Sequence, residues 1–129
     1  MKKRFLIVIA DYYKDISKGL LNSAIDILPK SSLIKIINVP GVFEIPVTIS
    51  KNIKKYDAFL ALGCVIKGQT PHFDFISHAT TDAIMKLSIE SKKPIGNGII
   101  TCLNMLQAKT RKKKGREAAV AVLSILSQK

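Results

Sequence analysis

The stretch Ala61-Leu-Gly-Cys-Val-Ile-Lys-Gly-Gln-Thr-Pro-His-Phe-Asp-Phe75 decides the fold of this chain and most of its chemistry. It predicts a buried apolar strand that runs into a glycine turn. A helix follows, with Thr70 at the N-cap, Pro71 at the first helical position and His72 in the first turn. The free N–H groups and positive dipole end of such a helix bind anions. The stretch therefore predicts a seat for a small anion beside an imidazole, which suits chemistry on a phosphorylated small molecule.

Outward from this stretch, strand-like and helix-like segments alternate along the chain. Strands are expected at 5–10, 33–39, 58–66 and 95–103, and helices at 16–28, 43–53, 72–91, 103–110 and 115–127. The start of the 43–53 segment also resembles a strand. This alternation predicts an α/β fold, a three-layer sandwich with a four-stranded parallel sheet, flavodoxin-like in class. Residues 1–129 are expected to form a single domain.

Ligands of such sheets bind beyond the carboxyl ends of the strands, and this rule brings several candidate residues to one rim. Tyr12 and Tyr13 follow the first strand, and one of them either stacks on a flat heterocycle or is a half-exposed tyrosine. Two prolines and a glycine surround Val42, Phe43 and Glu44. That cluster is either a rigid strand-to-helix turn or a binding site for the hydroxyl groups of a polyol, and the spacing of the residues does not distinguish these two interpretations. Thr101 is expected at the same rim.

The stretch from Gly63 to Thr70 nearly fits the nucleotide-binding loop G-x-x-x-x-G-K-[ST], with Gln69 where that loop needs lysine. Pro71 also removes a backbone N–H from the cradle. An ATPase or GTPase is therefore not expected, since neutralisation of the phosphate charge is central to that chemistry. A seat for a single phosphate needs fewer donors and remains possible.

His72 is either a capping or surface histidine, or a proton acceptor that the helix dipole keeps neutral. His78 lies six residues on, roughly on the opposite helix face, and is interpreted as structural. The two histidines lack the spacing of a metal pair and no carboxylate cluster joins them, so no metal is expected. Cys64 and Cys102 are interpreted as reduced core thiols of a cytoplasmic protein.

The chain carries 21 Lys and Arg against 9 Asp and Glu, a formal charge of +12. Such a positive net charge is compatible with binding to nucleic acid, to an acidic membrane or to phosphorylated substrates, but the charge alone does not identify the ligand. The lysines are scattered and aromatic residues are sparse, so no nucleic-acid partner is expected. The basic run 109–116 is either a solvated turn or a phosphate or nucleic-acid contact. No apolar run reaches the length of a membrane span, and the start of the chain does not resemble a signal peptide.

Two long motifs, taken with the shorter ones after them, resemble the lumazine synthase family across nearly the whole chain in order. The motifs are Val39-Pro-Gly-Val-Phe-Glu-Ile-Pro46, Tyr56-Asp57-Ala58, Leu62-Gly-Cys-Val-Ile-Lys-Gly-Gln-Thr-Pro-His-Phe-Asp74, Gly98-Ile-Ile-Thr101, Gln107-Ala108 and Lys114-Gly115. The resemblance implies the penultimate step of riboflavin biosynthesis. In that step 5-amino-6-(D-ribitylamino)uracil condenses with 3,4-dihydroxy-2-butanone 4-phosphate to 6,7-dimethyl-8-ribityllumazine, with no cofactor and no metal.

The resemblance also implies a role for each matching residue. Tyr12 would stack on the pyrimidine, and His72 would transfer protons. Residues that would hold the ribityl chain are Val42, Phe43 and Glu44; those that would line the pyrimidine are Cys64, Val65 and Ile66; those that would seat the phosphate are Gln69 and Thr70. Arg111 would close the phosphate site from a neighbouring subunit, with Lys114 and Glu117 nearby.

Two departures from the family pattern matter. Asn97 stands where many members have an aromatic residue, so it would use hydrogen bonds in place of stacking. The segment from Arg111 to Lys114 is shorter than in many members, which leaves open whether Arg111 or a neighbouring lysine holds the phosphate. Family members assemble as pentamers, and some build sixty-subunit shells. The short late loop, and the little chain before the first strand, favour a free homopentamer here. The rival functions are a nucleic-acid-binding module and a catalytically silent flavin or lumazine carrier.

Overall fold

Continuous apolar runs form the two central strands of the sheet, as strands buried on both faces require. In the computed structural model, which describes residues 2–128, β1 (Arg4–Ala10) pairs in parallel with β3 (Ala58–Ile66). The edge strands are β2 (Leu33–Val39), beside β1, and β4 (Ile95–Cys102), beside β3. The strand order is β2-β1-β3-β4 and every pairing is parallel, so the predicted four-stranded sheet is confirmed.

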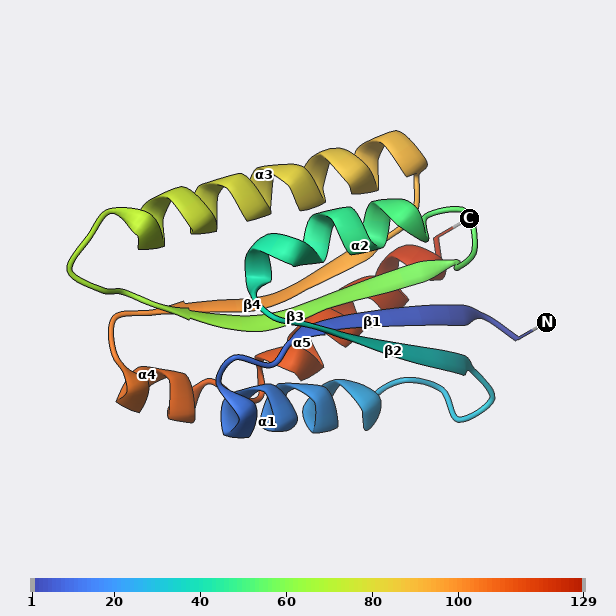
Figure 1. Ribbon diagram of the computed structural model, residues 1–129. Helices are drawn as coiled ribbons and strands as arrows, with labels where there is room; N and C mark the ends of the chain where they lie inside the picture. Colours follow the sequence, from blue (N-terminus) through green and yellow to red (C-terminus); the bar gives the residue numbers. More distant parts are fainter. Residues whose placement is uncertain (1, 129) are drawn as a thin grey trace.

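Helices cover both faces of this sheet and complete the predicted three layers (Figure 1). On one face lie α1 (Lys14–Ile25), α4 (Met105–Thr110) and α5 (Lys114–Leu126). On the other lie α2 (Ile45–Lys51) and α3 (His72–Ser91). None of the helices within residues 2–128 is long and apolar enough to cross a membrane.

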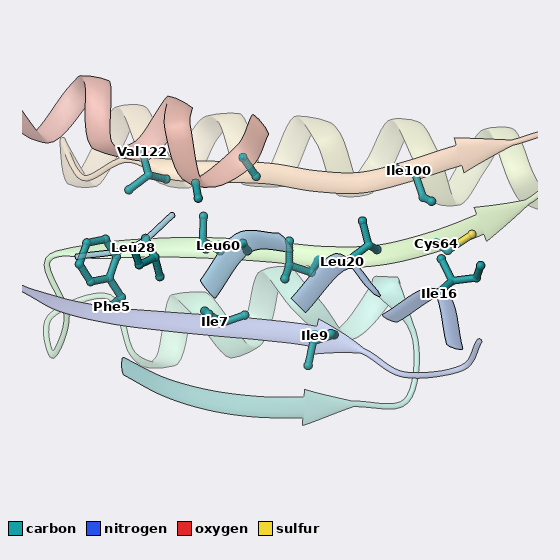
Figure 2. Packing of buried hydrophobic residues seen from close by; sticks show 14 of the residues in the cluster. Phe5, Ile7, Ile9, Ile16, Leu20, Leu28, Leu60, Cys64, Ile100 and Val122 are labelled. Carbon is teal, nitrogen blue, oxygen red and sulfur yellow. The ribbon is translucent and has the colours of Figure 1, made fainter. Parts of the chain in front are cut away.

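Side chains alternate between the sheet faces, and this period of two divides the core into two clusters. Phe5, Ile7 and Ile9 of β1 face α1 and α5, where they pack against Ile16 and other buried residues (Figure 2). The intervening residues Leu6 and Val8 face α2 and α3. The sheet is therefore buried on both faces, and its pairing places the carboxyl ends of β1 and β3 side by side.

Two predicted helix starts needed correction. The segment predicted as a helix from 43 begins with a 3-10 turn, Val42–Glu44, and α2 follows with Pro46 in its first turn. Proline is favoured there because its missing N–H would be unpaired in any case. The range 72–91 predicted for α3 is confirmed, but Thr70 was predicted as its N-cap and Pro71 as its first helical residue, each one position too far into the helix. Pro71 occupies the N-cap position, with φ −69° and ψ 4°, and His72 is the first helical residue.

Candidate active site

The carboxyl ends of β1 and β3 open into a cavity of about 800 Å³, called the rim cavity below. Its lining comes from residues 12–13 after β1, residues 41–44 after β2, the last three residues of β3, and four residues in the first two turns of α3. Those four are His72, Phe75, Ile76 and Ala79. The rim cavity thus lies where the rule for open parallel sheets predicts a ligand site.

Tyr12 stands at the mouth of the rim cavity with 75% of its surface exposed. Its neighbour Tyr13 meets it edge to face, with ring centroids 4.9 Å apart and planes 84° apart. Tyr13 itself packs against the core, and burial raises the pKa of its hydroxyl. Most of the Tyr12 ring is therefore accessible to a flat ring of a ligand, while its contact with Tyr13 limits its movement.

The segment 41–44 forms the rigid strand-to-helix turn expected from its prolines and glycine. Val42 is buried in the core, and Phe43 points outward with 60% of its surface exposed. The Glu44 N–H donates to the Gly41 carbonyl at 3.2 Å, and the Glu44 carbonyl accepts from the Thr48 hydroxyl at 2.8 Å. These bonds fix the backbone around the Glu44 carboxylate, which lines the rim cavity as a hydrogen-bond acceptor for hydroxyl groups.

The end of β3 supplies Cys64, Val65 and Ile66 to the floor of the rim cavity. Burial, together with nearby Cys102, raises the pKa of the Cys64 thiol to about 12. Both cysteines are free, and they lie on adjacent strands in the register that pairs Cys64 with Ile100. Cys64 is therefore a protonated apolar wall residue at neutral pH, not a nucleophile.

The start of α3, where the sequence predicted an anion-binding site, is exposed at the surface. Gln69 and Thr70 are exposed just before the helix, and the Thr70 hydroxyl accepts a long 3.4 Å hydrogen bond from the His72 N–H. The N–H groups of the first turn of a helix have no partner inside the helix and remain available to an anion. His72 lines the rim cavity, whereas Gln69 and Thr70 do not.

A second group of predicted residues lies apart from the rim cavity. Arg111 and Lys114 line another cavity, of about 440 Å³, with Thr101, Lys113 and Glu117 among the other lining residues. We call it the cationic cavity. The Arg111 Nη1 donates to the Thr101 carbonyl at 3.3 Å, and the Lys114 Nζ lies 3.2 Å from the Glu117 Oε1.

Asn97 lines neither the rim cavity nor the cationic cavity. It is exposed on edge strand β4, and its Oδ1 accepts a hydrogen bond from the Ile99 N–H at 3.0 Å. Its hydrogen-bonding capacity, which the sequence suggested for a ligand, is thus partly used by its own strand. The amide nitrogen of Asn97 is still a possible donor to a ligand.

The chain therefore brings eight of the predicted site residues together and holds the others elsewhere. Those in the rim cavity are Tyr12, Val42, Phe43, Glu44, Cys64, Val65, Ile66 and His72. Sequence reasoning missed the α3 residues Phe75, Ile76 and Ala79 as lining residues, whereas Tyr13 was considered beside Tyr12 as a stacking residue. Helical spacing from His72 was the signal for these three, because residues three, four and seven positions on lie on one helix face.

The sheet is open and parallel, and the rim cavity beyond its strand ends is concave and mostly apolar, with a few polar groups. This arrangement is typical of an α/β enzyme that binds a small molecule. A family model described as 6,7-dimethyl-8-ribityllumazine synthase matches residues 2–129. The chain therefore belongs to the 6,7-dimethyl-8-ribityllumazine synthase family, and it is an enzyme of the transferase class.

Curated relatives of that name cover nearly all of the chain. The relative from Buchnera aphidicola is 42% identical over 139 residues, which span 98% of this chain and 87% of the relative. The relative from Bartonella henselae is 42% identical over 138 residues, 99% of this chain and 89% of its own. The relative from Corynebacterium kroppenstedtii is 38% identical over 128 residues, 93% of this chain and 80% of its own. The family and the enzyme class expected from the motifs are thus confirmed.

Proposed function

We propose that this enzyme condenses 5-amino-6-(D-ribitylamino)uracil with 3,4-dihydroxy-2-butanone 4-phosphate to give 6,7-dimethyl-8-ribityllumazine, the penultimate step of riboflavin biosynthesis. The observation that carries the proposal is the rim cavity, which gathers a stacking tyrosine, a carboxylate and a histidine at the start of a helix. The free, buried cysteines suit a reaction in the cytoplasm.

Each part of the two substrates has a chemical partner in this arrangement. The flat pyrimidine would stack on Tyr12 above the apolar floor of residues 64–66. The ribityl hydroxyls would donate to the Glu44 carboxylate, beside Phe43. The phosphate would bind at the N-terminus of α3, near Gln69 and Thr70, where unpaired N–H groups and the helix dipole favour an anion.

The reaction needs little more than positioning and proton transfer. The primary amine of the pyrimidine adds to the ketone, and a first water is lost to form an imine. The hydroxyl-bearing carbon next to the imine then loses a proton, and inorganic phosphate leaves from the terminal carbon. The enol that results becomes a methyl ketone, and the ribityl-bearing nitrogen closes on this new carbonyl with loss of a second water. His72 would move the protons in these steps, since it lines the rim cavity at the start of α3. No cofactor or metal is required for this sequence of bond changes.

The direct test mixes the purified enzyme with both substrates and follows the lumazine chromophore. We expect product to form faster than in a control without protein. Equal rates of product formation with and without the enzyme would contradict the proposal, and would favour the function of a flavin or lumazine carrier. A lack of product, combined with steeply salt-dependent binding to random oligonucleotides, would instead favour the nucleic-acid function.

Replacement of His72 by alanine is expected to slow turnover without abolishing it. Positioned proton transfer contributes about a hundredfold at the low end of its range, and both substrates are reactive on their own. We therefore expect kcat to fall by about tenfold to a hundredfold while the KM values change little. His78→Ala is the matched control, because His78 is exposed on the same helix and does not line the rim cavity. An unchanged kcat for His72→Ala would remove His72 from the mechanism.

We also propose that the enzyme is a homopentamer with its sites between adjacent subunits. Arg111 and Lys114 lie in the cationic cavity, apart from Tyr12 and His72, so a second copy is needed to bring the two groups together. Large apolar side chains are exposed, among them Phe43 and Phe75 at the rim cavity and Leu106 on α4. Burying such side chains between copies would stabilise an assembly.

A homopentamer is expected to have a solution mass about five times the 14.2 kDa of one chain. Multi-angle light scattering at several protein concentrations measures this mass directly. A mass near a megadalton would contradict the free pentamer and indicate a closed shell, while a mass of one chain would contradict a site shared between subunits.

A further inference from the structure

The residues that line the cationic cavity are carried by a very short connection. Only residues 111–113 separate α4 from α5, and Arg111 and Lys113 both line the cavity. The connection makes local hydrogen bonds, including one from the Lys114 N–H to the Arg111 carbonyl at 3.0 Å. An exposed arginine with a long side chain needs its backbone held in place if it is to meet a ligand in one geometry.

The connection between α4 and α5 is hydrogen-bonded to the hydroxyl of Ser23, which is distant in the sequence. The Ser23 Oγ on α1 lies 3.1 Å from the Lys112 carbonyl and 3.0 Å from the Leu20 carbonyl. Its single proton is thus shared between its own helix and the connection. Ser23 is partly buried and lies 89 positions from Lys112, so this bond joins two segments that the sequence does not connect.

Close packing on both sides of that bond restricts the connection further. Gly115, the second residue of α5, lies so close to α1 that a Cβ there would be 2.0 Å from the Leu20 carbonyl oxygen. The Lys112 side chain lies over Gly19 in the same way, since a Cβ on Gly19 would be 2.7 Å from the Lys112 Cδ. Figure 1 shows α1 and α5 on the same face of the sheet, where they pack against each other. The face of α1 formed by residues 19, 20 and 23 is therefore a cradle for residues 112–115.

We propose that Ser23 is a positioning residue for phosphate binding: through the Lys112 carbonyl it holds the connection so that Arg111 keeps its place in the cationic cavity. This inference rests on the proposed function, in which Arg111 meets the phosphate of the four-carbon substrate. Ser23 lies outside both cavities and touches no substrate in this scheme. Its effect therefore acts through the position of Arg111 alone.

The test compares Ser23→Ala with Ser124→Ala. Ser124 on α5 is a matched control, because its hydroxyl bonds only within its own helix, to the Ala121 carbonyl at 2.8 Å. For Ser23→Ala we expect the KM of the four-carbon phosphate to rise about three- to tenfold, the usual effect of losing one hydrogen bond. We expect kcat and the KM of the ribitylaminouracil to stay within about twofold, because neither depends on the geometry of Arg111. Calorimetric titration with inorganic phosphate should show the same three- to tenfold weakening without any turnover.

The outcomes separate this inference from the proposed function. If both KM values and kcat change together, or if Ser124→Ala matches Ser23→Ala, the role of Ser23 is only structural and the inference is wrong. An unchanged affinity for phosphate in a folded Ser23→Ala enzyme would also contradict it. If the unsubstituted enzyme makes no lumazine but Ser23→Ala alone weakens phosphate binding, the positioning role stands and the proposed reaction fails.

Discussion

Replacement of Gly115 by alanine is expected to lower the free energy of unfolding by about 2 kcal/mol, within the range for overpacked sites. An added Cβ would lie 2.0 Å from the Leu20 carbonyl oxygen and 2.9 Å from its carbonyl carbon, and backbone atoms cannot rotate away. Helix α1 or α5 must then shift as a unit, and each carries part of the core that covers β3. The helix propensity of alanine opposes this loss by at most about 1 kcal/mol. Chemical denaturation followed by circular dichroism measures the difference.

Gly68→Ala is the control for this prediction. A Cβ on Gly68 would meet no heavy atom within 4 Å, and Gly68 has no positive φ that would disfavour alanine. We expect its free energy of unfolding to stay within about 0.5 kcal/mol of the unsubstituted enzyme. If Gly115→Ala proves as stable as Gly68→Ala, the α1–α5 contact is not as tight as described, and the cradle for residues 112–115 loses its support.

Two variants with reduced activity, each substituted on a different side of the proposed shared site, are expected to regain activity when they assemble together. Glu44→Ala removes a group from the rim cavity, and Arg111→Ala removes one from the cationic cavity. Each variant alone should lose about tenfold to a hundredfold in kcat/KM, since each loses a hydrogen bond from substrate to a charged group. In a randomly mixed ring with head-to-tail contacts, about one quarter of the sites would combine an intact half from each variant. Co-expression from two differently tagged genes and assay of the doubly purified oligomer measures the recovery.

The matched control pairs two variants with damage on the same side. Arg111→Ala mixed with Lys114→Ala leaves every site with a substituted cationic half, so no recovery is expected. Recovery in the control, or none in the Glu44→Ala and Arg111→Ala mixture, would contradict a site shared between subunits. Activity would then have to come from residues of one chain.

The alternation of strands and helices in the sequence predicted which residues would gather at the rim cavity, because most of them lie at or soon after the end of a strand. Val42, Glu44, Cys64 and His72 each lie just beyond or at the end of a strand, and parallel strands deliver such residues to the same edge. The range of α3 was predicted correctly, but Pro71 was taken as its first helical residue instead of its N-cap, and the reason is local. Proline satisfies the φ of both an N-cap and a first helical residue, so only the ψ of Pro71, 4°, distinguishes the two.

The four parallel strands, the helices between them and the residues that line the rim cavity at the strand ends could be predicted from the sequence alone. These features depend on hydrophobic periodicity and on turn residues, and both act between positions that are close in the sequence. The tertiary structure decided that Arg111 and Lys114 lie in a separate cavity, and that Ser23 and Gly115 join α1 to the connection between α4 and α5. These contacts depend on how two helices pack over the sheet, and packing between distant segments leaves no periodic signal in the sequence.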